Sequence, residues 1–283
     1  MFKKYYSITK PGIIYGNLIT AAGGFLLASK AHIYLSLFLA TLAGTSLIIG
    51  SACVFNNYID RDIDKAMART KKRALVEGSI SGQNALIFAG LLGIVGVLVL
   101  VLYVNLLVLY IGLAAFFVYV VLYGIAKRRS VHGTILGSIS GAAPVVAGYC
   151  AVTNHFNGGA IILFLILVLW QMPHFYAIAM YRLDDYAAAK IPVLPIVKGP
   201  RHTKTQILFY IAAFILANVA LSLLGYTGYI YLIVMVLLGI AWFWLGIKGF
   251  KIDNKKWARK MFYLSLIVIL SLSVMLSIGS RIA

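Results

Sequence analysis

An asparagine and two aspartates recur at intervals of four residues where a long apolar stretch ends, as Asn56, Asp60 and Asp64. Residues four apart on a helix lie nearly above one another, so these three side chains would share one face, and Asp62 would point elsewhere. Two ionised carboxylates one turn apart repel each other, and a bound cation offsets that repulsion. Carboxylate and amide oxygens suit Mg²⁺, which commonly binds phosphates through one or two carboxylates. The spacing therefore predicts a magnesium site.

Basic residues follow these acids closely in the chain, at Arg69, Lys71, Lys72 and Arg73. Acids that hold a metal beside bases that hold an anion are what a site for magnesium and a diphosphate requires. The alternative is a solvated helix end, in which the acids pair with Arg61 and Lys65.

Two further charged segments are candidates for the same site. Residues 181–199 ("YRLDDYAAAKIPVLPIVKG") hold two acids and two lysines, which are Asp184, Asp185, Lys190 and Lys198. Residues 123–129 hold three bases, and Tyr123 precedes Lys127 by one helical turn. We expect the acids to approach the metal and the bases to approach the anion.

The composition places these polar groups in a membrane protein. Of the 283 residues, 62% are hydrophobic and 11% are charged, whereas soluble domains carry about 25% charged residues. Nine apolar stretches are long enough to cross a bilayer, which takes about 20 residues each. They lie near residues 11–30, 33–59, 84–104, 105–126, 132–152, 159–181, 204–226, 228–248 and 257–280. We predict an all-α fold, a polytopic membrane bundle of nine transmembrane helices in one domain over residues 1–283.

The charged residues segregate to one side of this predicted topology. Only Lys30 and Arg281, of the 25 Lys and Arg residues, fall on the side opposite the N-terminus, and all seven acids fall on the N-terminal side. The positive-inside rule then places the N-terminus in the cytoplasm and the C-terminus outside. The net charge of +18 reflects this segregation and an attraction to anionic lipid, so it requires no nucleic-acid partner.

Five segments carry a resemblance to a known family: "TKPGIIYGNLI", "CVFNNYIDRDIDKAMART", "SGAAPVVAGY", "WQMPHFYAIAMYRLDDY" and "IPVLPIVKG". Over nearly the whole chain, and in the same order, they resemble the UbiA-type intramembrane prenyltransferases, most closely the branch that farnesylates heme. The resemblance implies a nine-helix bundle around a central cavity that opens sideways to lipid. It also implies a bacterial cytoplasmic (inner) membrane location.

The resemblance assigns roles to the polar residues. It implies that Asn56, Asp60 and Asp64 bind Mg²⁺ and diphosphate. The implied diphosphate contacts are Arg69, Lys72, Arg73, Tyr123, Lys127, Arg128 and Lys198. The family's second motif is DxxxD, but here Ala189 stands four residues after Asp185. Only one end of that motif remains, which we assign to Asp185 as a further metal and catalytic residue.

The resemblance implies that a farnesyl group passes from farnesyl diphosphate to a vinyl group of heme b, with addition of water. The expected partners are these two substrates, membrane lipid, and possible contacts with other heme-pathway or terminal-oxidase components. An aromatic prenyltransferase that makes a quinone precursor is an alternative, but it predicts a complete second DxxxD. A transporter would place its polar site near the bilayer midplane. A lipid-headgroup phosphotransferase would carry a different aspartate signature.

Two polar residues lie inside apolar stretches. His174 lies two turns inside the inner end of its helix, and ionisable residues within membrane helices are candidates for function. Imidazole suits heme iron, so we consider His174 as a heme contact. The alternative is a hydrogen bond to a neighbouring helix, with Pro173 only kinking the chain. Asn17 is similarly either a polar group of a heme pocket or a bond between helices.

Small and aromatic residues give two further expectations. The glycines at 133, 137 and 141 would form a face that lets helices approach closely. The indoles of Trp242, Trp244 and Trp257 would lie at the membrane interface or face lipid.

The topology is testable with reporter fusions. A reporter fused after Ala283 should lie outside the cytoplasm, and one fused after Lys198 should lie inside, because nine spans separate the two ends of the chain. Alkaline phosphatase and green fluorescent protein activities distinguish the two sides. Both reporters on one side would contradict the nine-span topology.

Overall fold

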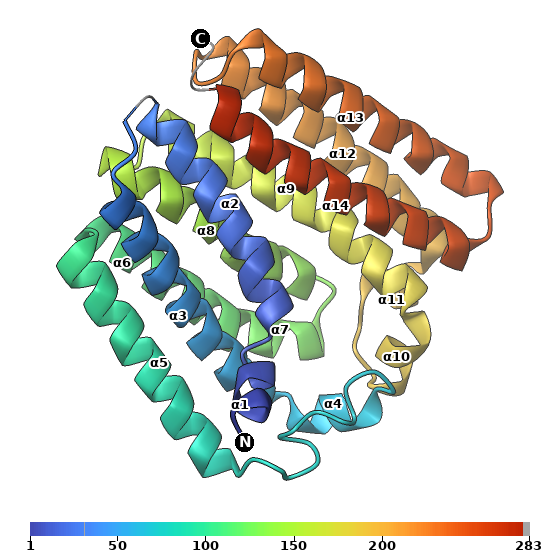
Figure 1. Cartoon of the computed structure of the whole chain (residues 1–283). Coiled ribbons are helices and arrows are strands. Elements are labelled where there is room, and N and C mark those ends of the chain that lie inside the picture. The colour runs from blue at the N-terminus through green and yellow to red at the C-terminus, as the bar shows by residue number, and fades with distance from the viewer. Residues whose placement is uncertain (31, 280–283) are drawn as a thin grey trace.

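The computed structural model describes residues 1–30 and 32–279 and is built of helices (Figure 1). Within those residues, nine helices are long and apolar enough to cross a membrane, so the predicted number of spans is confirmed. The first five are α2 (Pro11–Ser29), α3 (Leu35–Ile59), α5 (Gly82–Tyr103), the combined span Leu106–Arg129 and α8 (Gly133–Thr153). The others are α9 (Gly158–Tyr181), α12 (Gly199–Leu223), α13 (Tyr229–Lys248) and α14 (Asn254–Gly279).

The fourth span is not a uniform α-helix. It runs as α6 (Leu106–Phe117), the π-helical segment η1 (Val118–Tyr123) and α7 (Gly124–Arg129). It therefore ends at Arg129, later than the predicted 126, which brings all three bases of residues 127–129 into the helix. The seventh span begins at Gly199, earlier than the predicted 204, because Pro200 suits the first turn of a helix.

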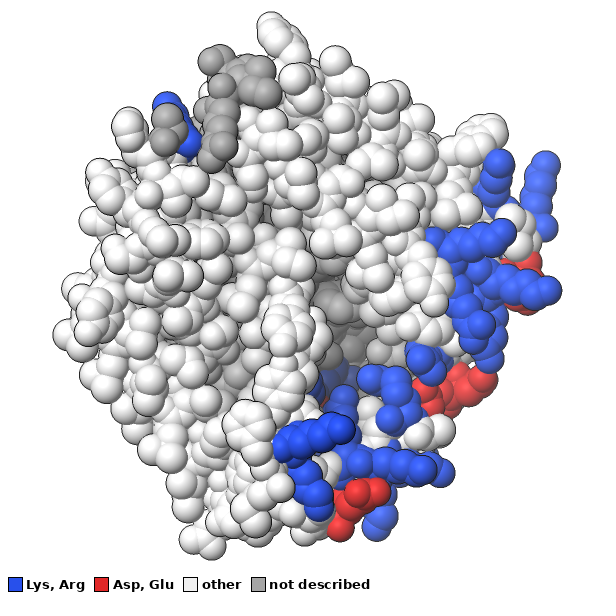
Figure 2. Space-filling view, viewed as in Figure 1, with Lys and Arg blue, Asp and Glu red and all other residues white. Residues whose placement is uncertain are grey.

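Short helices occupy one end of the bundle. They are α1 (Phe2–Ile8), α4 (Arg61–Ala66), α10 (Leu183–Ala188) and α11 (Leu194–Val197), and the sequence did not predict them. The turn η2 (Gly249–Lys251) lies between α13 and α14. On the visible face, Lys, Arg, Asp and Glu side chains gather at this end (Figure 2). The end of α14 lies at the opposite end of the bundle from α1 (Figure 1).

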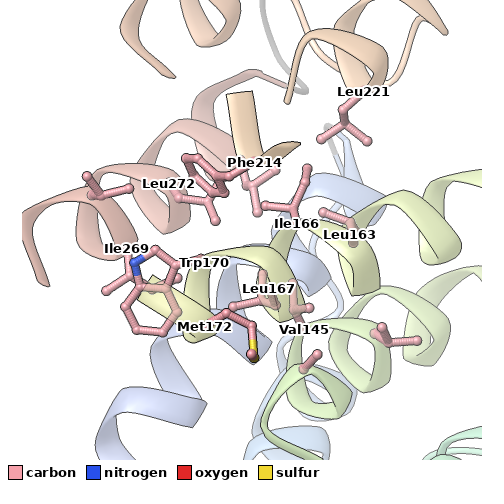
Figure 3. Close-up of a cluster of buried hydrophobic side chains, with 14 of the residues drawn as sticks. Val145, Leu163, Ile166, Leu167, Trp170, Met172, Phe214, Leu221, Ile269 and Leu272 are labelled. Atoms are coloured by element: carbon pink, nitrogen blue, oxygen red, sulfur yellow. The ribbon is translucent and has the colours of Figure 1, made fainter. Parts of the chain in front are cut away.

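The central helices are α8 and α9, which pack against each other. Helix α2 packs on α8, and α9 also contacts α12 and α14. Helices α3 and α5 pack against each other. Interlocking apolar side chains fill the contacts around α9; Figure 3 shows Trp170 beside Ile269 of α14. Since lipid tails are as apolar as these side chains, close packing rather than hydrophobic burial holds such helices together.

Two of the three tryptophans that the sequence assigned to the membrane interface or to lipid are buried instead. Trp242 and Trp257 are fully buried, so the expectation of lipid-facing indoles is wrong for them; Trp244, which is 58% exposed, fits it. Trp257 packs over Gly249 and donates its indole N–H to the Leu245 carbonyl at 2.8 Å. A hydrogen bond within an apolar contact therefore holds α14 against the end of α13.

Glycines set the spacing of α2 and α8. A Cβ at Gly148 would lie 1.9 Å from the Ala21 carbonyl oxygen, and one at Gly24 would lie 2.1 Å from the Val145 carbonyl oxygen. In the predicted glycine face of α8, a Cβ at Gly133 would likewise lie 2.7 Å from the Cα of Lys127, whereas Gly137 and Gly141 face the side chains of Tyr123 and Gln171. Backbone contact between helices is thus possible only with glycine at positions 24, 133 and 148.

This contact predicts a specific loss of stability. Gly148→Ala should lower the free energy of unfolding by about 1–3 kcal/mol, because the added methyl group has no room against α2. Gly90→Ala is the matched control, since a Cβ there meets nothing within 4 Å. Thermal unfolding in detergent measures both. Equal free energies of unfolding for the two variants would show that α2 and α8 can move apart for the added methyl group without loss of stability.

Candidate active site

Asn56, Asp60 and Asp64 form one stripe in the structure, as predicted, although α3 ends and α4 begins within it. Although α3 ends at Ile59, backbone hydrogen bonds continue from Asp60 N to the Asn56 carbonyl (2.9 Å) and from Asp64 N to the Asp60 carbonyl (2.8 Å). All three side chains are buried, whereas the side chain of Asp62 is 65% exposed. The helical spacing therefore identified the buried face correctly.

Bases from two other segments neutralise the buried acids. Asp60 pairs with Lys127 of α7, and Asp64 accepts from Arg73 at 2.5 Å. The alternative pairing with Arg61 and Lys65 is not observed in the part of the chain that is described. Arg61 instead lies 3.8 Å over the ring of Tyr58. A buried carboxylate without a partner is costly, so these contacts offset the cost of burying both acids.

Asn56 receives a base that the sequence did not assign to the site. Its Oδ1 accepts from Lys10 Nζ at 2.7 Å and from Tyr119 Oη at 3.4 Å, while its buried Nδ2 has no hydrogen-bond partner. Burial lowers the pKa of Lys10 to about 8. Lys10 adopts a left-handed backbone conformation (φ 56°) at the start of α2, a strained state of the kind that occurs at functional sites. The sequence signals for Lys10 were its place just before Pro11 and its position in the family-like segment "TKPGIIYGNLI".

Asp62 holds a base that borders the site. It accepts from both terminal nitrogens of Arg128 at 2.6 and 2.8 Å, and this guanidinium lowers the pKa of Asp62 to about 2. Arg128 also donates to the Ile59 carbonyl and lies 3.5 Å from Asp60 Oδ1. Asp62 therefore faces away from the acidic stripe, yet it fixes a cation beside Asp60.

The acids of the second segment have contacts outside the stripe of Asn56, Asp60 and Asp64. Asp185 Oδ1 accepts from the backbone N–H of Ala68 at 3.2 Å, so it joins the two inner loops. Asp184 is exposed and pairs with Lys255 at 3.5 Å. Across residues 1–30 and 32–279, no three Asp, Glu, His or Cys side chains cluster tightly enough to hold a metal by themselves. A metal-binding role for Asp185 stays a prediction.

Three predicted diphosphate contacts are exposed side chains, namely Arg69, Lys72 and Lys198. Arg69 lies near Tyr186, where its charge opposes the rise in the pKa of Tyr186 that burial causes. Among the described residues, no hydrogen bond or ion pair is made by the side chain of Lys72 or Lys198. Their predicted role is untested by this arrangement.

The π-helical segment η1 presents two tyrosines to the site. The rings of Tyr119 and Tyr123 stack with centroids 5.5 Å apart, and Lys127 Nζ lies 4.8 Å above the Tyr123 ring. The extra residue in such a turn shifts the helical face, and these turns often occur at functional sites. Here it aims Tyr119 at Asn56, which no sequence pattern indicated.

A cavity of about 470 Å³ leads away from the charged cluster into the bundle. Lys127 and Tyr123 line it beside the charged cluster, Gln171 and His174 of α9 line it farther in, and most of the remaining lining is apolar. This size suits a small organic ligand. Since Lys127 both lines the cavity and pairs with Asp60, the cavity meets the acidic stripe at this lysine.

The cavity has a side opening between α2 and α14. These helices touch near Gly23, where a Cβ would lie 3.1 Å from the Cα of Ser273, but nearer the inner end both line the cavity through Gly16 and Leu266. Figure 2 shows this face hollowed next to the basic residues. The predicted central cavity that opens sideways is thus present.

The two intramembrane polar residues lie on the cavity. His174 Nδ1 is 2.7 Å from Ser265 Oγ of α14, and its ring stacks on Trp170 with centroids 4.8 Å apart. The hydrogen bond to a neighbouring helix, which was the alternative to a heme contact, is therefore present, and the heme contact stays a prediction. Asn17 bonds its own helix, donating to the Ile13 carbonyl at 2.8 Å. A bond between helices by Asn17 is not seen in the described part of the chain.

The residues of the acidic stripe fit a magnesium ion that is bound together with phosphate. Asp60 Oδ1 is buried and accepts no hydrogen bond from a described residue, and the guanidinium of Arg128 lies 3.5 Å from it. Mg²⁺ usually takes one or two carboxylates and completes its shell with water and phosphate oxygens. Asp60, Asp64 and the Asn56 amide would supply oxygens of the kind that this ion prefers.

Comparisons with known proteins point to one family. A model of the UbiA prenyltransferase family matches residues 17–267. The chain is 54% identical to the protoheme IX farnesyltransferase of Yersinia pseudotuberculosis serotype O:1b (strain IP 31758), and the match covers 100% of this chain and 96% of that protein. It is 52% identical to the protein of the same name from Photorhabdus laumondii, covering 100% and 97%.

Solved structures show the same fold at low sequence identity. A digeranylgeranylglyceryl phosphate synthase superposes with a TM-score of 0.81 at 19% identity, covering 99% of this chain and 98% of that chain. A UbiA homolog from Archaeoglobus fulgidus, solved with GPP and Mg²⁺ bound, superposes with a TM-score of 0.68 at 15% identity, covering 97% and 99%.

The position of Lys10 generates a test of anion binding. Lys10→Met should weaken the binding of pyrophosphate with Mg²⁺ by about 10–100-fold, because a hydrogen bond from a charged group contributes about 1.5–3 kcal/mol. Lys3→Met is the matched control, since Lys3 is an exposed lysine of α1. Isothermal titration calorimetry measures both affinities. Equal affinities would remove Lys10 from the anion site.

Proposed function

The chain belongs to the UbiA prenyltransferase family, and from that premise we propose that it transfers a farnesyl group from farnesyl diphosphate to a vinyl group of heme b. The observation that carries the proposal is the match over the full chain to protoheme IX farnesyltransferases. The buried acids and bases at the mouth of an apolar cavity support it, because a charged diphosphate and an apolar chain need those two environments.

The charged end of the cavity would bind the diphosphate. Asn56, Asp60 and Asp64 would hold Mg²⁺, and Asp185 would support them from the second loop. The proposed diphosphate contacts are Lys10, Arg69, Lys72, Arg73, Tyr123, Lys127, Arg128 and Lys198. When bound, Mg²⁺ supplies positive charge that stabilises the departing diphosphate. Lys127 and Arg73 are already placed by their acids, so little reorganisation accompanies the growth of negative charge.

The bond changes follow from this placement. The bond between C1 of the farnesyl group and its oxygen breaks, and the diphosphate leaves with the electron pair. The vinyl π electrons of heme b then form the new carbon–carbon bond, and water adds to the resulting cation and releases a proton. The stacked rings of Tyr119 and Tyr123 present π faces that favour a nearby cation. The apolar lining keeps water from the allylic cation until the bond has formed.

The quinone-precursor alternative finds less support. It called for a complete second DxxxD, whereas Ala189 follows Asp185 in this chain. A transporter is disfavoured because the acids gather at one end of the bundle rather than near its middle (Figure 2). The protein is an integral membrane protein, and we propose the bacterial cytoplasmic membrane with the N-terminus inside, as the charge segregation favours.

Product analysis tests the function directly. The purified protein with heme b, farnesyl diphosphate and Mg²⁺ should give a hydroxyethylfarnesyl heme by mass spectrometry, and chelation of Mg²⁺ should stop the reaction. Asp60→Asn and Asp64→Asn should abolish the product, because each removes a buried charge at the metal. Asp62→Asn should be milder, because Asp62 only positions Arg128.

A normal level of membrane insertion is the control for these variants. Equal losses in all three would point to general surface charge rather than to one helical face. An unmodified heme pool with the unaltered protein would contradict the proposed function.

A further inference from the structure

We propose that His174 binds the iron of the heme substrate through Nε2, and that Ser265 is the positioning residue that prepares His174 for this. The inference rests on the proposed function, since it concerns how that substrate is held. It is carried by a hydrogen-bond chain between α9 and α14, in which the sequence did not identify Ser265 as the partner of His174.

This chain of hydrogen bonds determines which ring nitrogen of His174 carries the proton. Ser265 Oγ lies 2.6 Å from the Phe262 carbonyl and 2.7 Å from His174 Nδ1. A carbonyl only accepts, so the hydroxyl proton of Ser265 points to Phe262. The hydroxyl oxygen must then accept from His174, which places the proton on Nδ1. In a neutral imidazole this leaves the lone pair on Nε2.

That lone pair opens onto the cavity. His174 lines the cavity, and its Nε2 makes no hydrogen bond to any described residue. Nε2 is also not among the enclosed polar atoms that lack a partner, so the cavity reaches it. A histidine whose only function was to join α9 to α14 would have no need of an accessible second nitrogen.

Aromatic contacts hold the ring in place from several sides. Trp170 stacks on it at 4.8 Å, Phe262 lies 5.1 Å away, and Phe175 meets it edge-on at 5.4 Å. Trp170 also donates its indole N–H to the Ser265 carbonyl at 2.9 Å. Both the imidazole and its hydroxyl partner are thus anchored, which is the arrangement that orients metal-binding histidines.

The location suits an apolar, flat ligand that carries a metal. His174 lies seven residues before Tyr181, the last residue of α9, or about 10 Å from the inner end at 1.5 Å per residue. The diphosphate site is at that inner end, on α3 and α7. The iron would therefore lie deeper than the diphosphate, in the apolar part of the same cavity.

Heme spectroscopy on the purified protein tests the inference. With ferric heme b as the probe, His174→Ala should weaken binding at least about 10-fold and shift the Soret band and the electron paramagnetic resonance signal. Exogenous imidazole should restore both signals in His174→Gly. Ser265→Ala should weaken heme binding by about 10–100-fold and alter the iron–histidine stretch in the ferrous resonance Raman spectrum. Ser265→Thr, which keeps the hydroxyl, should restore the stretch.

Ser273→Ala is the matched control. Ser273 is a buried serine of the same helix whose hydroxyl bonds the Ile269 carbonyl within that helix at 3.0 Å. It should leave the heme spectrum unchanged, and all variants should bind pyrophosphate with Mg²⁺ normally if they fold.

The outcomes separate the inference from the function on which it rests. Product formation by the unaltered protein, together with an unchanged heme spectrum in His174→Ala, would overturn the iron contact and leave the farnesyl transfer standing. A changed spectrum in His174→Gly that imidazole does not restore would also overturn it. A spectrum of Ser265→Ala identical to that of Ser273→Ala would remove Ser265 from the positioning role.

Discussion

The burial of Asp60 and Asp64 is the constraint on which the inner end of the molecule depends. Two carboxylates within one turn cannot stay ionised in an apolar setting unless cations reach them. Lys127 comes from the end of the fourth span, and Arg73 comes from the loop after α4. The fold must therefore close that loop and α7 over the end of α3. The need to neutralise Asp60 thus holds together two segments that are more than sixty residues apart in the sequence.

The charges of this cluster sum to a net positive charge, which is equal and opposite to the charge of the proposed ligand. Lys10, Arg73 and Lys127 face Asp60 and Asp64, while Arg128 is balanced by Asp62. One positive charge is left. A fully ionised prenyl diphosphate with one Mg²⁺ carries one negative charge. Binding would neutralise the site, and the bases could turn from the carboxylates to the diphosphate as the metal takes their place.

The sequence predicted what depends on regular spacing and hydropathy. The interval of four residues placed Asn56, Asp60 and Asp64 on one buried face, and apolar length gave the spans. It did not predict contacts between distant segments, such as Lys10 with Asn56 or His174 with Ser265. Helices that are apolar all round show no pattern that separates a packed face from a lipid face, which is why buried Trp242 was assigned to lipid.

The fold separates the two proposed substrates by giving each its own helices. The diphosphate end is built by α3, α4 and α7, whereas His174 and Ser265 join α9 to α14. The partner of the imidazole is a neutral hydroxyl, which suits its depth, since a carboxylate there would place a charge inside the bilayer. A carboxylate would also make the imidazole a stronger ligand. A hydroxyl fixes the same tautomer and would hold the iron less tightly, which suits the proposed role of heme as a substrate that has to leave.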